Sequence, residues 1–438
     1  MRHRSTQQLS FGDGFIDPSL FALNDELKEV DKLMSDASLL QPFEAIFSPT
    51  MGRPGTAVDV YLRMMYLKFR WGLAYEEVEQ EVRERIPWRF FCHLSLDDTV
   101  PDATTLIKLN QRFGEKRIEA MNRRLVKHIS KENKLTVRKI RIDTTTIEAN
   151  ITYPTDVKLL HQVVKTVTRT VQRAGGKITS HVRATKKAIA RLGQSLKSKS
   201  KDRNKQAQKT LKRVTRYAHD TVTKAKAVLE QIKTTATQAR VVGVLEEQLH
   251  LADRILTQTG QKLHGATAIP ERIVSFYDPH ARPIRKGKLG KENEFGRTLA
   301  LVQDASGVFV HYKIHHGNPS DKTLAVPLVK TVNKTFHTTV QAAALDKGFY
   351  SAENLAKLHK LGVHQAAIPK VGRLNPSEKR RQQARWFRRM YKFRCGIEAG
   401  ISMLKRCFSL NRIRGSGDSG TAIWVGFALF SYNLWQRT

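Results

Sequence analysis

The sequence predicts a mixed α/β (α+β) protein in three parts: a helical N-terminal region, a core of strands and helices, and a basic helical insertion within that core. Apolar residues recur at helical spacing from the N-terminus to about residue 134. Strand-like alternation begins at Leu135 and returns after residue 265, whereas basic helical patterns fill the stretch between. The expected boundaries are 1–134 for the helical region, 135–155 with 266–438 for the α/β core, and 156–265 for the insertion.

The composition favours a polyanionic partner. The chain has 438 residues, and its 76 lysines and arginines exceed its 40 acidic residues, which gives a formal net charge of +36 and a pI near 10.3. This field attracts nucleic acid first and an anionic membrane second, but no amphipathic membrane anchor is evident. Three cysteines without a Cys-x-x-Cys argue against a disulfide scaffold or a zinc ribbon. The N-terminus lacks the apolar run of a signal peptide, and Ala422–Leu434 is too short to span a bilayer, so we expect a soluble protein of a reducing compartment.

The N-terminal region is expected to bind DNA through a helix-turn-helix arrangement. Short helices joined by tight turns suit that motif, and its recognition helix is expected at Ala103–Arg112, with Thr104, Lys108 and Gln111 as outward polar residues. The alternative is a helical bundle that makes no DNA contact. The four helices expected before the first strand are, in order, Asn24–Met34, Thr56–Gly72, Tyr75–Arg85 and Pro101–Phe113.

A first aspartate follows the first predicted strand. Residues 135–142 alternate apolar and basic side chains, which indicates a strand with one solvent-exposed face that ends at Asp143. A carboxylate at the C-terminal end of a strand can project from the sheet into a cleft, although an aspartate there commonly just begins a turn. Glu148 lies five residues further on and is a candidate to support Asp143.

The insertion is expected to form a basic helical hairpin or coiled-coil arm. Leucines and valines recur at helical spacing in its first part, and residues 177–216 hold 14 lysines and arginines but one acid. Turns are expected at Gly175–Gly176 and at 198–201. Such an arm can contact DNA phosphates without reading sequence, and the alternative is a disordered charged linker. The cations expected to make phosphate contacts are Lys186, Lys187, Lys212 and Arg213.

A second aspartate follows a short apolar strand. Residues 340–345 form that strand, Asp346 ends it, and Gly348 lets the backbone turn sharply beside the carboxylate. The elements expected around it are a strand at 273–277, a basic loop from 278 to 291, a hairpin of strands 296–303 and 308–315, a helix after Asn318, a helix at 354–361, a strand at 363–368 and a basic loop at 369–385.

Other polar residues compete for a functional role. Asp278, Asp304 and Asp321 lie at predicted turns or a helix start, where aspartate commonly serves a structural purpose. Asp321 is the strongest of the three because it starts a helix beside the hairpin. The adjacent pair His315-His316 is expected on a strand, where neighbours point to opposite faces, so we interpret these histidines as surface or DNA-facing residues.

A polar stripe marks the helix expected near the C-terminus. Arg394, Glu398 and Lys405 lie 3, 7 and 14 residues after Tyr391. At about 100° per residue these four side chains fall within roughly 60° of one another. Most other positions are apolar, which indicates a buried helix with one polar stripe. The alternative is an ordinary amphipathic helix with a solvated charged face.

These motifs together resemble insertion-sequence transposases of the IS4/IS5 superfamily. The spacing Tyr-x2-Arg-x3-Glu-x6-Lys is similar to the motif around their catalytic glutamate, residues 142–147 to their first-aspartate strand, and residues 346–349 to their second-aspartate motif. The stretch from Gly52 to Phe113 also resembles their N-terminal helical region, through Gly-Arg-Pro and Val-Pro-Asp-Ala-Thr-Thr-Leu. The resemblance spans nearly the whole chain outside the insertion and implies an RNase H-like core of five strands flanked by helices.

The resemblance also implies a catalytic set of Asp143, Asp346 and Glu398. Three carboxylates close together cannot all stay ionised without a cation, and hard oxygen ligands select Mg²⁺ or Mn²⁺. We expect two such ions, with Asp143 bridging both, Asp346 holding one and Glu398 the other. Water would first free a 3′-OH at the element's end, and that 3′-OH would then attack target DNA. Arg394 and Lys405 are expected to hold phosphates, and Tyr391 to stack on a base or donate to a phosphate.

The implied partners are double-stranded DNA, both at the terminal inverted repeats of the element and at the target, and further copies of the chain in a homodimer or larger synaptic complex. The implied location is the nucleoid in the cytoplasm of a bacterium or archaeon. Three alternatives are a catalytically inactive DNA-binding descendant of a transposase, an RNase H-like nuclease that cuts without joining, and a non-enzymatic basic nucleoid or RNA-binding protein. The last accounts for the charge but not for three ordered motifs.

Overall fold

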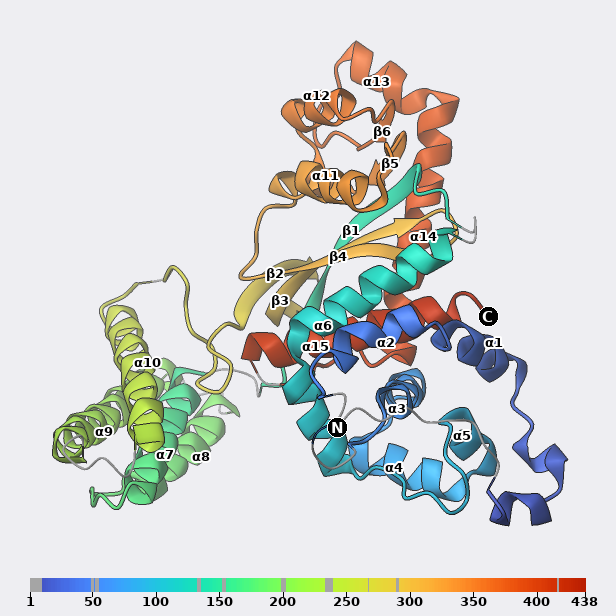
Figure 1. Cartoon of the computed structure of the whole chain (residues 1–438). Coiled ribbons are helices and arrows are strands. Elements are labelled where there is room, and N and C mark those ends of the chain that lie inside the picture. Colours follow the sequence, from blue (N-terminus) through green and yellow to red (C-terminus); the bar gives the residue numbers. More distant parts are fainter. Residues whose placement is uncertain are drawn as a thin grey trace. The chain divides into compact units, whose positions relative to one another are not determined.

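The computed structural model divides the chain into two compact units (Figure 1). Unit 1 comprises residues 1–150 and 298–438, and unit 2 comprises residues 151–297. The structure describes residues 10–48, 51, 55–131, 135–151, 155–197, 202–232, 239–266, 268–288, 291–415 and 417–438. The Gly-Arg-Pro stretch at 52–54, the expected turn at 198–201 and the N-terminal residues 1–8 lie outside these ranges.

The N-terminal part of unit 1 is helical, as predicted. Asn24 caps the first helix through its side chain, which accepts a hydrogen bond from the backbone N–H of Leu27. The last helix is broken at Gly114, whose φ of 68° is left-handed, so the expected recognition helix is separate from the helical segment that follows. Two short helices, α2 and α5, were not predicted. The helices are α1 Asp25–Met34, α2 Ala37–Glu44, α3 Val58–Trp71, α4 Tyr75–Glu84, α5 Ile86–Phe91 and α6 Ala103–Lys131.

The N-terminal helices share their hydrophobic core with the rest of unit 1. The terminal helix α15, Gly417–Trp435, packs against α3 and α6. Phe69 stacks on Phe427, and the side-chain amide of Asn122 donates a hydrogen bond of 2.9 Å to the carbonyl of Gly426. This continuous packing means that the N-terminal helices do not form a compact unit of their own.

The sheet of unit 1 is mixed. Strand β1 pairs with β5, and β5 with β6, in parallel, while β3 and β4 form the predicted antiparallel hairpin. The order is β3-β1-β5-β6, and β4 pairs with β3. The first residues of β3, up to Arg297, belong to unit 2. The strands are β1 Lys139–Glu148, β3 Lys291–Asp304, β4 Phe309–His315, β5 Ala342–Leu345 and β6 Gln365–Ala367.

Helices follow the strands in the C-terminal part of unit 1. Helix α14 packs on β1, β5 and β6, α11 on β4, and α12 on β6. Residues 369–385, expected to be a basic loop, contain an unpredicted helix, α13. Asn375 caps that helix and Pro376 occupies its first position, which together are a local start signal. The helices are α11 Ala325–Phe336, α12 Ala352–Lys360, α13 Pro376–Gln383 and α14 Arg385–Cys407.

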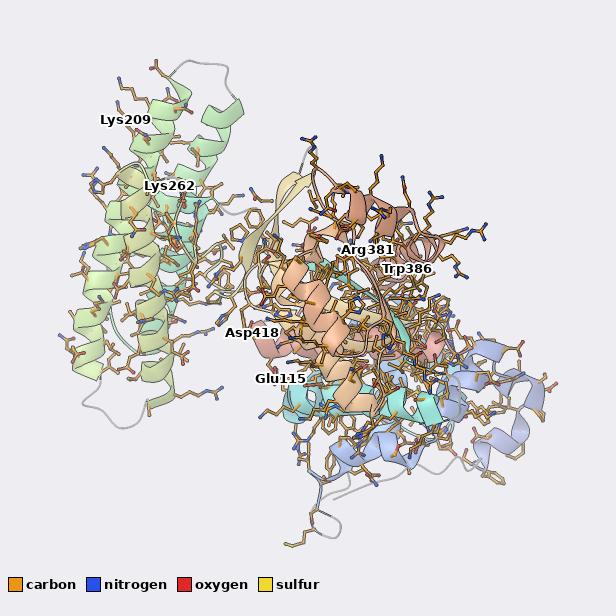
Figure 2. All side chains as sticks on the ribbon, turned by 90° about the horizontal axis from the view of Figure 1, so that it is seen from above. Glu115, Lys209, Lys262, Arg381, Trp386 and Asp418 are labelled. Atoms are coloured by element: carbon orange, nitrogen blue, oxygen red, sulfur yellow. The ribbon has the colours of Figure 1, made fainter. Side chains whose placement is uncertain are left out.

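In its described residues, unit 2 is a bundle of four helices around its own apolar core. Where a helical hairpin or coiled-coil arm was expected, the described residues form a helical bundle, and they are not a disordered linker. The predicted turn after α7 is confirmed at Gly175. Figure 2 shows nitrogen-tipped side chains along these helices, with Lys209 among them. The helices are α7 Asp156–Arg173, α8 Val182–Lys197, α9 Arg203–Ile232 and α10 Ala239–Leu263.

The strand expected at 273–277 is not formed. Ile273 and Phe276 pack into the core of the bundle, and the side chain of Gln258 bonds both the N–H and the C=O of Ile273. A side chain thus satisfies backbone groups that a neighbouring strand would otherwise satisfy. Where a basic loop was expected, the described part of unit 2 instead contains strand β2, Arg282–Lys288, which pairs antiparallel with the first residues of β3.

Within the described residues, none of the helices combines the length and the apolar character that crossing a bilayer requires.

Candidate active site

Helix α14 brings a single charged side chain against the sheet. Its buried positions recur every three or four residues, so they form one stripe on the side that contacts β1, β5 and β6. Arg394 is the only charged residue in that stripe, and 9% of its side chain is exposed. A buried guanidinium needs anionic partners to compensate for its lost hydration. The stripe consists of Phe387, Met390, Arg394, Ile397, Gly400 and Leu404.

The sheet supplies two carboxylates at one level. Ile142 of β1 pairs in parallel register with Leu345 of β5, so Asp143 and Asp346 are the next residue on each of two adjacent strands. The prediction that a strand ends at Asp143 is wrong, because β1 continues to Glu148. The pairing of β1 with β5 ends at Ile142, and β5 itself ends at Leu345. Asp143 and Asp346 are therefore neighbours at the end of β5.

Arg394 links the first aspartate to the glutamate. Its Nη1 lies 3.6 Å from Asp143 Oδ2, and its Nη2 donates a hydrogen bond of 2.7 Å to Glu398 Oε1, one helical turn away. Burial opposes the charge on Arg394, but the hydrogen bond to Glu398 and the charges of Asp346 and Asp143 outweigh it and raise the pKa of the guanidinium. Asp143, Asp346, Arg394 and Glu398 therefore form one electrostatic cluster, which we call the carboxylate cluster.

The electrostatics of Asp143 are unusual for an aspartate. Burial, together with the charges of Asp346 and Asp321, raises the pKa of its carboxyl to about 6, even though the Thr144 N–H and Arg394 favour the ionised form. The Thr144 N–H donates a hydrogen bond of 2.7 Å to Asp143 Oδ1, which orients the carboxylate. A carboxyl group that is costly to ionise beside other carboxylates is typical of functional sites.

Asp321 lies beside the cluster. The Thr144 hydroxyl donates a hydrogen bond of 3.0 Å to Asp321 Oδ1, and a Cβ added at Gly348 would lie 2.8 Å from Asp321 Oδ2. The loop after Asp346 thus needs a residue without a side chain at Gly348 to leave room for this carboxylate. Asp321 remains a competitor for a functional role, as the sequence suggested.

The other two competing aspartates have structural partners. Asp304 accepts hydrogen bonds from the backbone N–H groups of Ser306 and Val308 and so closes the β3–β4 turn. Asp278 receives two hydrogen bonds from Arg297, of 2.9 and 2.6 Å, in the interior of unit 2. Both carboxylates therefore stabilise the fold, Asp304 by holding a turn and Asp278 by pairing with a buried arginine.

Sequence reasoning missed Arg141, which lies between β1 and α14. Its Nη1 donates a hydrogen bond of 3.0 Å to the carbonyl of Phe393, and its Nε donates one of 2.8 Å to Gln303 Oε1. A Cβ at Gly396 would overlap the guanidinium of Arg141, so the glycine allows the helix to approach the strand here. Two features of the sequence could have pointed to this contact. Arg141 lies two residues before Asp143 and so on the same face of the strand, and the helix expected near the C-terminus carries two glycines, Gly396 and Gly400, that would allow a close approach.

The remaining residues of the polar stripe are less buried. Tyr391 is 41% exposed, and its ring centroid lies 5.5 Å from the guanidinium carbon of Arg394, which is within cation–π range. Lys405 is partly exposed near the end of α14. His316 lies 3.6 Å from Asp418, and the pKa of His315 is lowered by burial and by the nearby charges of Lys313 and His316.

The residues predicted to bind DNA elsewhere are on the surface. Thr104, Lys108 and Gln111 are exposed on α6. In unit 2, Lys186 and Lys187 are exposed on α8, and on α9 Lys212 is exposed and Arg213 is half-buried. The last two line a groove of about 650 Å³ between α8 and α9, together with Arg191, Lys209 and Arg216. Their contact with DNA stays a prediction.

Two family models match this chain. Residues 18–112 match the family described as Transposase domain (DUF772), and residues 258–434 match the family described as Transposase DDE domain. The two matches support an insertion-sequence transposase, an enzyme that acts on DNA. Asp346 and Glu398 lie inside the second match, whereas Asp143 and most of the helical bundle lie outside both matches. The expectation that Asp143 belongs to the catalytic set therefore rests on the geometry of the carboxylate cluster and on the motif around Asp143, not on the family matches.

One relative of unknown function is also similar. A stretch of 157 residues is 26% identical to the uncharacterized protein ORF8 in the nfe locus of Rhizobium meliloti, covering 34% of this chain and 75% of that protein. No solved structure matches the chain.

Proposed function

We propose that this transposase cuts the 3′ ends of its element by metal-dependent hydrolysis and joins them to target DNA, with Asp143, Asp346 and Glu398 as its catalytic carboxylates. The observation that carries the proposal is the register of β1 and β5, which sets Asp143 and Asp346 side by side, with α14 bringing Arg394 and Glu398 to them. The strand order and the two parallel pairs support an RNase H-like core, and the polar stripe supports a place in the IS4/IS5 superfamily.

The cluster's donors suit a hard divalent cation. Asp143 has a raised pKa because it is buried beside two other carboxylates, and a cation held there would favour its ionised form. Asp143, Asp346 and Glu398 would hold Mg²⁺ or Mn²⁺, which are ions that prefer carboxylate oxygens. Such ions, when bound, make water a stronger nucleophile at phosphorus and stabilise the leaving oxygen.

The protein's own groups have separate roles in this proposal. The Thr144 N–H fixes the orientation of the Asp143 carboxylate, and Arg394 holds Asp143 and Glu398 toward one another. Tyr391, on the exposed edge of α14, stacks on a base or donates to a phosphate, while Lys405 binds a phosphate. No nucleophilic side chain is required, because water and then a DNA 3′-OH make the attacks.

DNA binding is assigned to two surfaces, one on the expected recognition helix and one on unit 2. Thr104, Lys108 and Gln111 face solvent on one helix, as the outward residues of a recognition helix must. The exposed lysines of unit 2 suit phosphate contacts that hold DNA without reading its sequence. Because both ends of an element must be held together for joining, we propose a homodimer or larger complex on DNA.

The test is cleavage and joining of a labelled DNA fragment that carries the element's own ends, in Mg²⁺. Wild type is compared with Asp143→Asn, Asp346→Asn, Glu398→Gln and Asp321→Asn, and a gel-shift assay verifies DNA binding by each variant. The proposal expects the first three variants to bind but neither cut nor join, and Asp321→Asn to keep measurable activity.

Other outcomes separate the alternatives. Cutting without joining by wild type would indicate a nuclease, and binding without either reaction would indicate an inactive descendant. If Asp321→Asn neither cuts nor joins while Glu398→Gln does both, the third metal ligand is Asp321 and the proposed role of Glu398 is wrong.

A further inference from the structure

A cationic hollow of about 300 Å³ lies in unit 2 between α7, α10 and the segment before β2. Five of its residues come from one face of α7, four from one face of α10, and one from the segment that follows α10. The lining residues are Lys165, Thr166, Arg169, Thr170, Arg173, Arg240, Val241, Val244, Gln248 and Tyr277. We call this hollow the α7/α10 pocket.

The pocket's positive charge is uncompensated. Its four cations, Lys165, Arg169, Arg173 and Arg240, are exposed, and no carboxylate belongs to its lining. None of the four forms an ion pair with any residue in the described ranges. The sequence itself has no aspartate or glutamate from 157 to 201 or from 231 to 245. Four arginine and lysine side chains converge here without a partner, which is the arrangement of an anion site.

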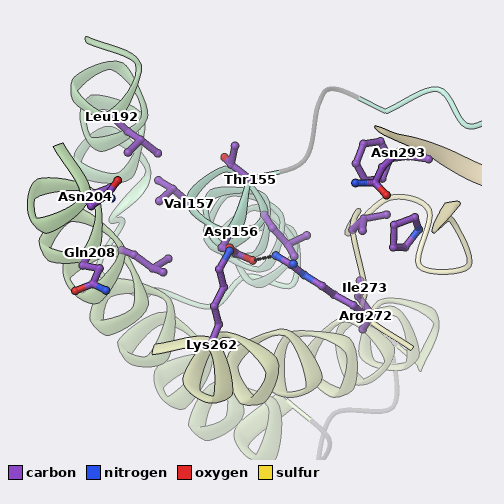
Figure 3. Close-up of a pocket in the computed structure, with 16 residues that line it drawn as sticks. Thr155, Asp156, Val157, Leu192, Asn204, Gln208, Lys262, Arg272, Ile273 and Asn293 are labelled. Atoms are coloured by element: carbon purple, nitrogen blue, oxygen red, sulfur yellow. Dashed lines mark hydrogen bonds and ion pairs between the residues drawn. The ribbon is translucent and has the colours of Figure 1, made fainter. Parts of the chain in front are cut away.

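A second hollow in the same unit differs because its cations are paired with a carboxylate of the protein. This hollow measures about 620 Å³ and includes Asp156, Lys262 and Arg272. There Asp156 pairs with both cations, so their charge is neutralised within the protein (Figure 3). The larger hollow is therefore built around an internal ion pair, whereas the α7/α10 pocket leaves its cations available to a ligand.

The uncharged part of the pocket offers an aromatic surface and an acceptor. Tyr277 is 57% exposed and Val244 is 41% exposed, so both side chains are accessible to a ligand. The Tyr277 hydroxyl is held by Thr166 Oγ1 at 3.2 Å, which fixes the ring at the pocket. Gln248 Oε1 is buried and has no hydrogen-bond partner among the described residues. A buried acceptor without a donor is costly unless a ligand supplies one.

We propose that the α7/α10 pocket binds one unpaired nucleotide of a single DNA strand. Tyr277 stacks on the base, Gln248 Oε1 accepts a hydrogen bond from an N–H group on the base edge, and the four cations hold the flanking phosphates. Duplex DNA cannot satisfy this site, because its bases are stacked and paired inside the helix. The volume is at the lower end of ligand pockets, which suits one nucleotide rather than several.

This inference does not depend on the carboxylate cluster, since binding is measured without metal. Fluorescence anisotropy of a labelled single-stranded oligonucleotide in EDTA is compared with a duplex of the same sequence, using the full chain. Tyr277→Ala should weaken single-strand binding by roughly 5- to 150-fold, the range found for one stacked base. Tyr277→Phe keeps the ring and should bind nearly as wild type, and neither variant should affect duplex binding.

The cations are tested by salt dependence. Arg169→Ala and Arg240→Ala should each lower the slope of log affinity against log salt for the single strand by about 0.7, whereas Tyr277→Ala should leave the slope unchanged. Arg183→Ala is the matched control, because Arg183 is an exposed arginine of the same bundle that lies outside the pocket. Thermal unfolding confirms that each variant is folded.

A photo-crosslink locates the base. An oligonucleotide containing 5-iodo-2′-deoxyuridine should crosslink to Tyr277 when single-stranded and not when annealed, as mapped by mass spectrometry. Crosslinks elsewhere, with Tyr277→Ala as tight as wild type, would overturn the proposal. Equal losses for duplex and single strand would overturn it too, because the pocket would then be part of a general cationic surface.

Discussion

Replacing Asp143 with asparagine should make the metal-free protein more stable wherever the Asp143 carboxyl would be ionised in the unfolded chain, most of all above pH 6. Asp143 is held in a largely desolvated position, with 18% of its side chain exposed, where its carboxyl has a pKa of about 6 instead of 3.8. In the unfolded chain this carboxyl loses its proton first, so the folded state carries a penalty that appears as pH rises through 3.8 and is complete above about 6. Asparagine has nearly the same shape and no charge, so it avoids that penalty.

The size of the gain follows from the shift. A pKa raised from 3.8 to about 6 corresponds to about 3 kcal/mol at pH 8 and about half of that at pH 5. For a compact unit of a few hundred residues, each kcal/mol moves the melting temperature by about 2 °C. We therefore expect Asp143→Asn to melt about 6 °C higher than wild type at pH 8 and about 3 °C higher at pH 5.

Differential scanning calorimetry in EDTA at the two pH values measures this difference. Asp97→Asn, at an exposed position, serves as the control and should change little at either pH. Adding Mg²⁺ at pH 8 should raise the melting temperature of wild type more than that of Asp143→Asn, because only wild type keeps the full ligand set. A variant that is less stable than wild type at pH 8, or equally stabilised at both pH values, would refute the reasoning.

Four further substitutions test packing, ion pairing and helix capping in the two units. Gly396→Ala should destabilise unit 1 by about 1–3 kcal/mol in urea unfolding, because the added Cβ would overlap Arg141. Gly193→Ala places its Cβ in open space on α8 and should instead stabilise the bundle by about 0.5–1 kcal/mol. Asp278→Asn should cost about 3–5 kcal/mol because it leaves Arg297 buried without its anion, and unfolding of unit 2 unchanged by the mutation would contradict this. Asn375→Ala should cost about 1 kcal/mol by removing the cap of α13, seen as faster amide exchange in that helix alone.

The local patterns predicted most elements near the site. The helix that carries Glu398, the hairpin and the short strand before Asp346 are confirmed because each has a strong local pattern: a buried stripe, a turn between alternating strands, and an apolar run before a glycine turn. The strand at 273–277 failed because its apolar residues are equally suited to a helical bundle. Helix α13 was missed although Asn375-Pro376 is a start signal, since its charged sequence lacks an apolar face.

By itself the sequence determined the chemistry available to this protein: the three carboxylates with their motifs, the polar stripe of α14 and the large excess of positive charge. These features depend only on residue type and spacing, so they can be read directly from the sequence. Only the tertiary structure decided which charges meet. The register of two strands distant in sequence sets Asp143 beside Asp346, burial raises the pKa of Asp143, and packing leaves Asp321 next to the cluster while Asp278 and Asp304 are paired elsewhere. Proximity and desolvation arise from contacts between remote segments, and no local pattern encodes them.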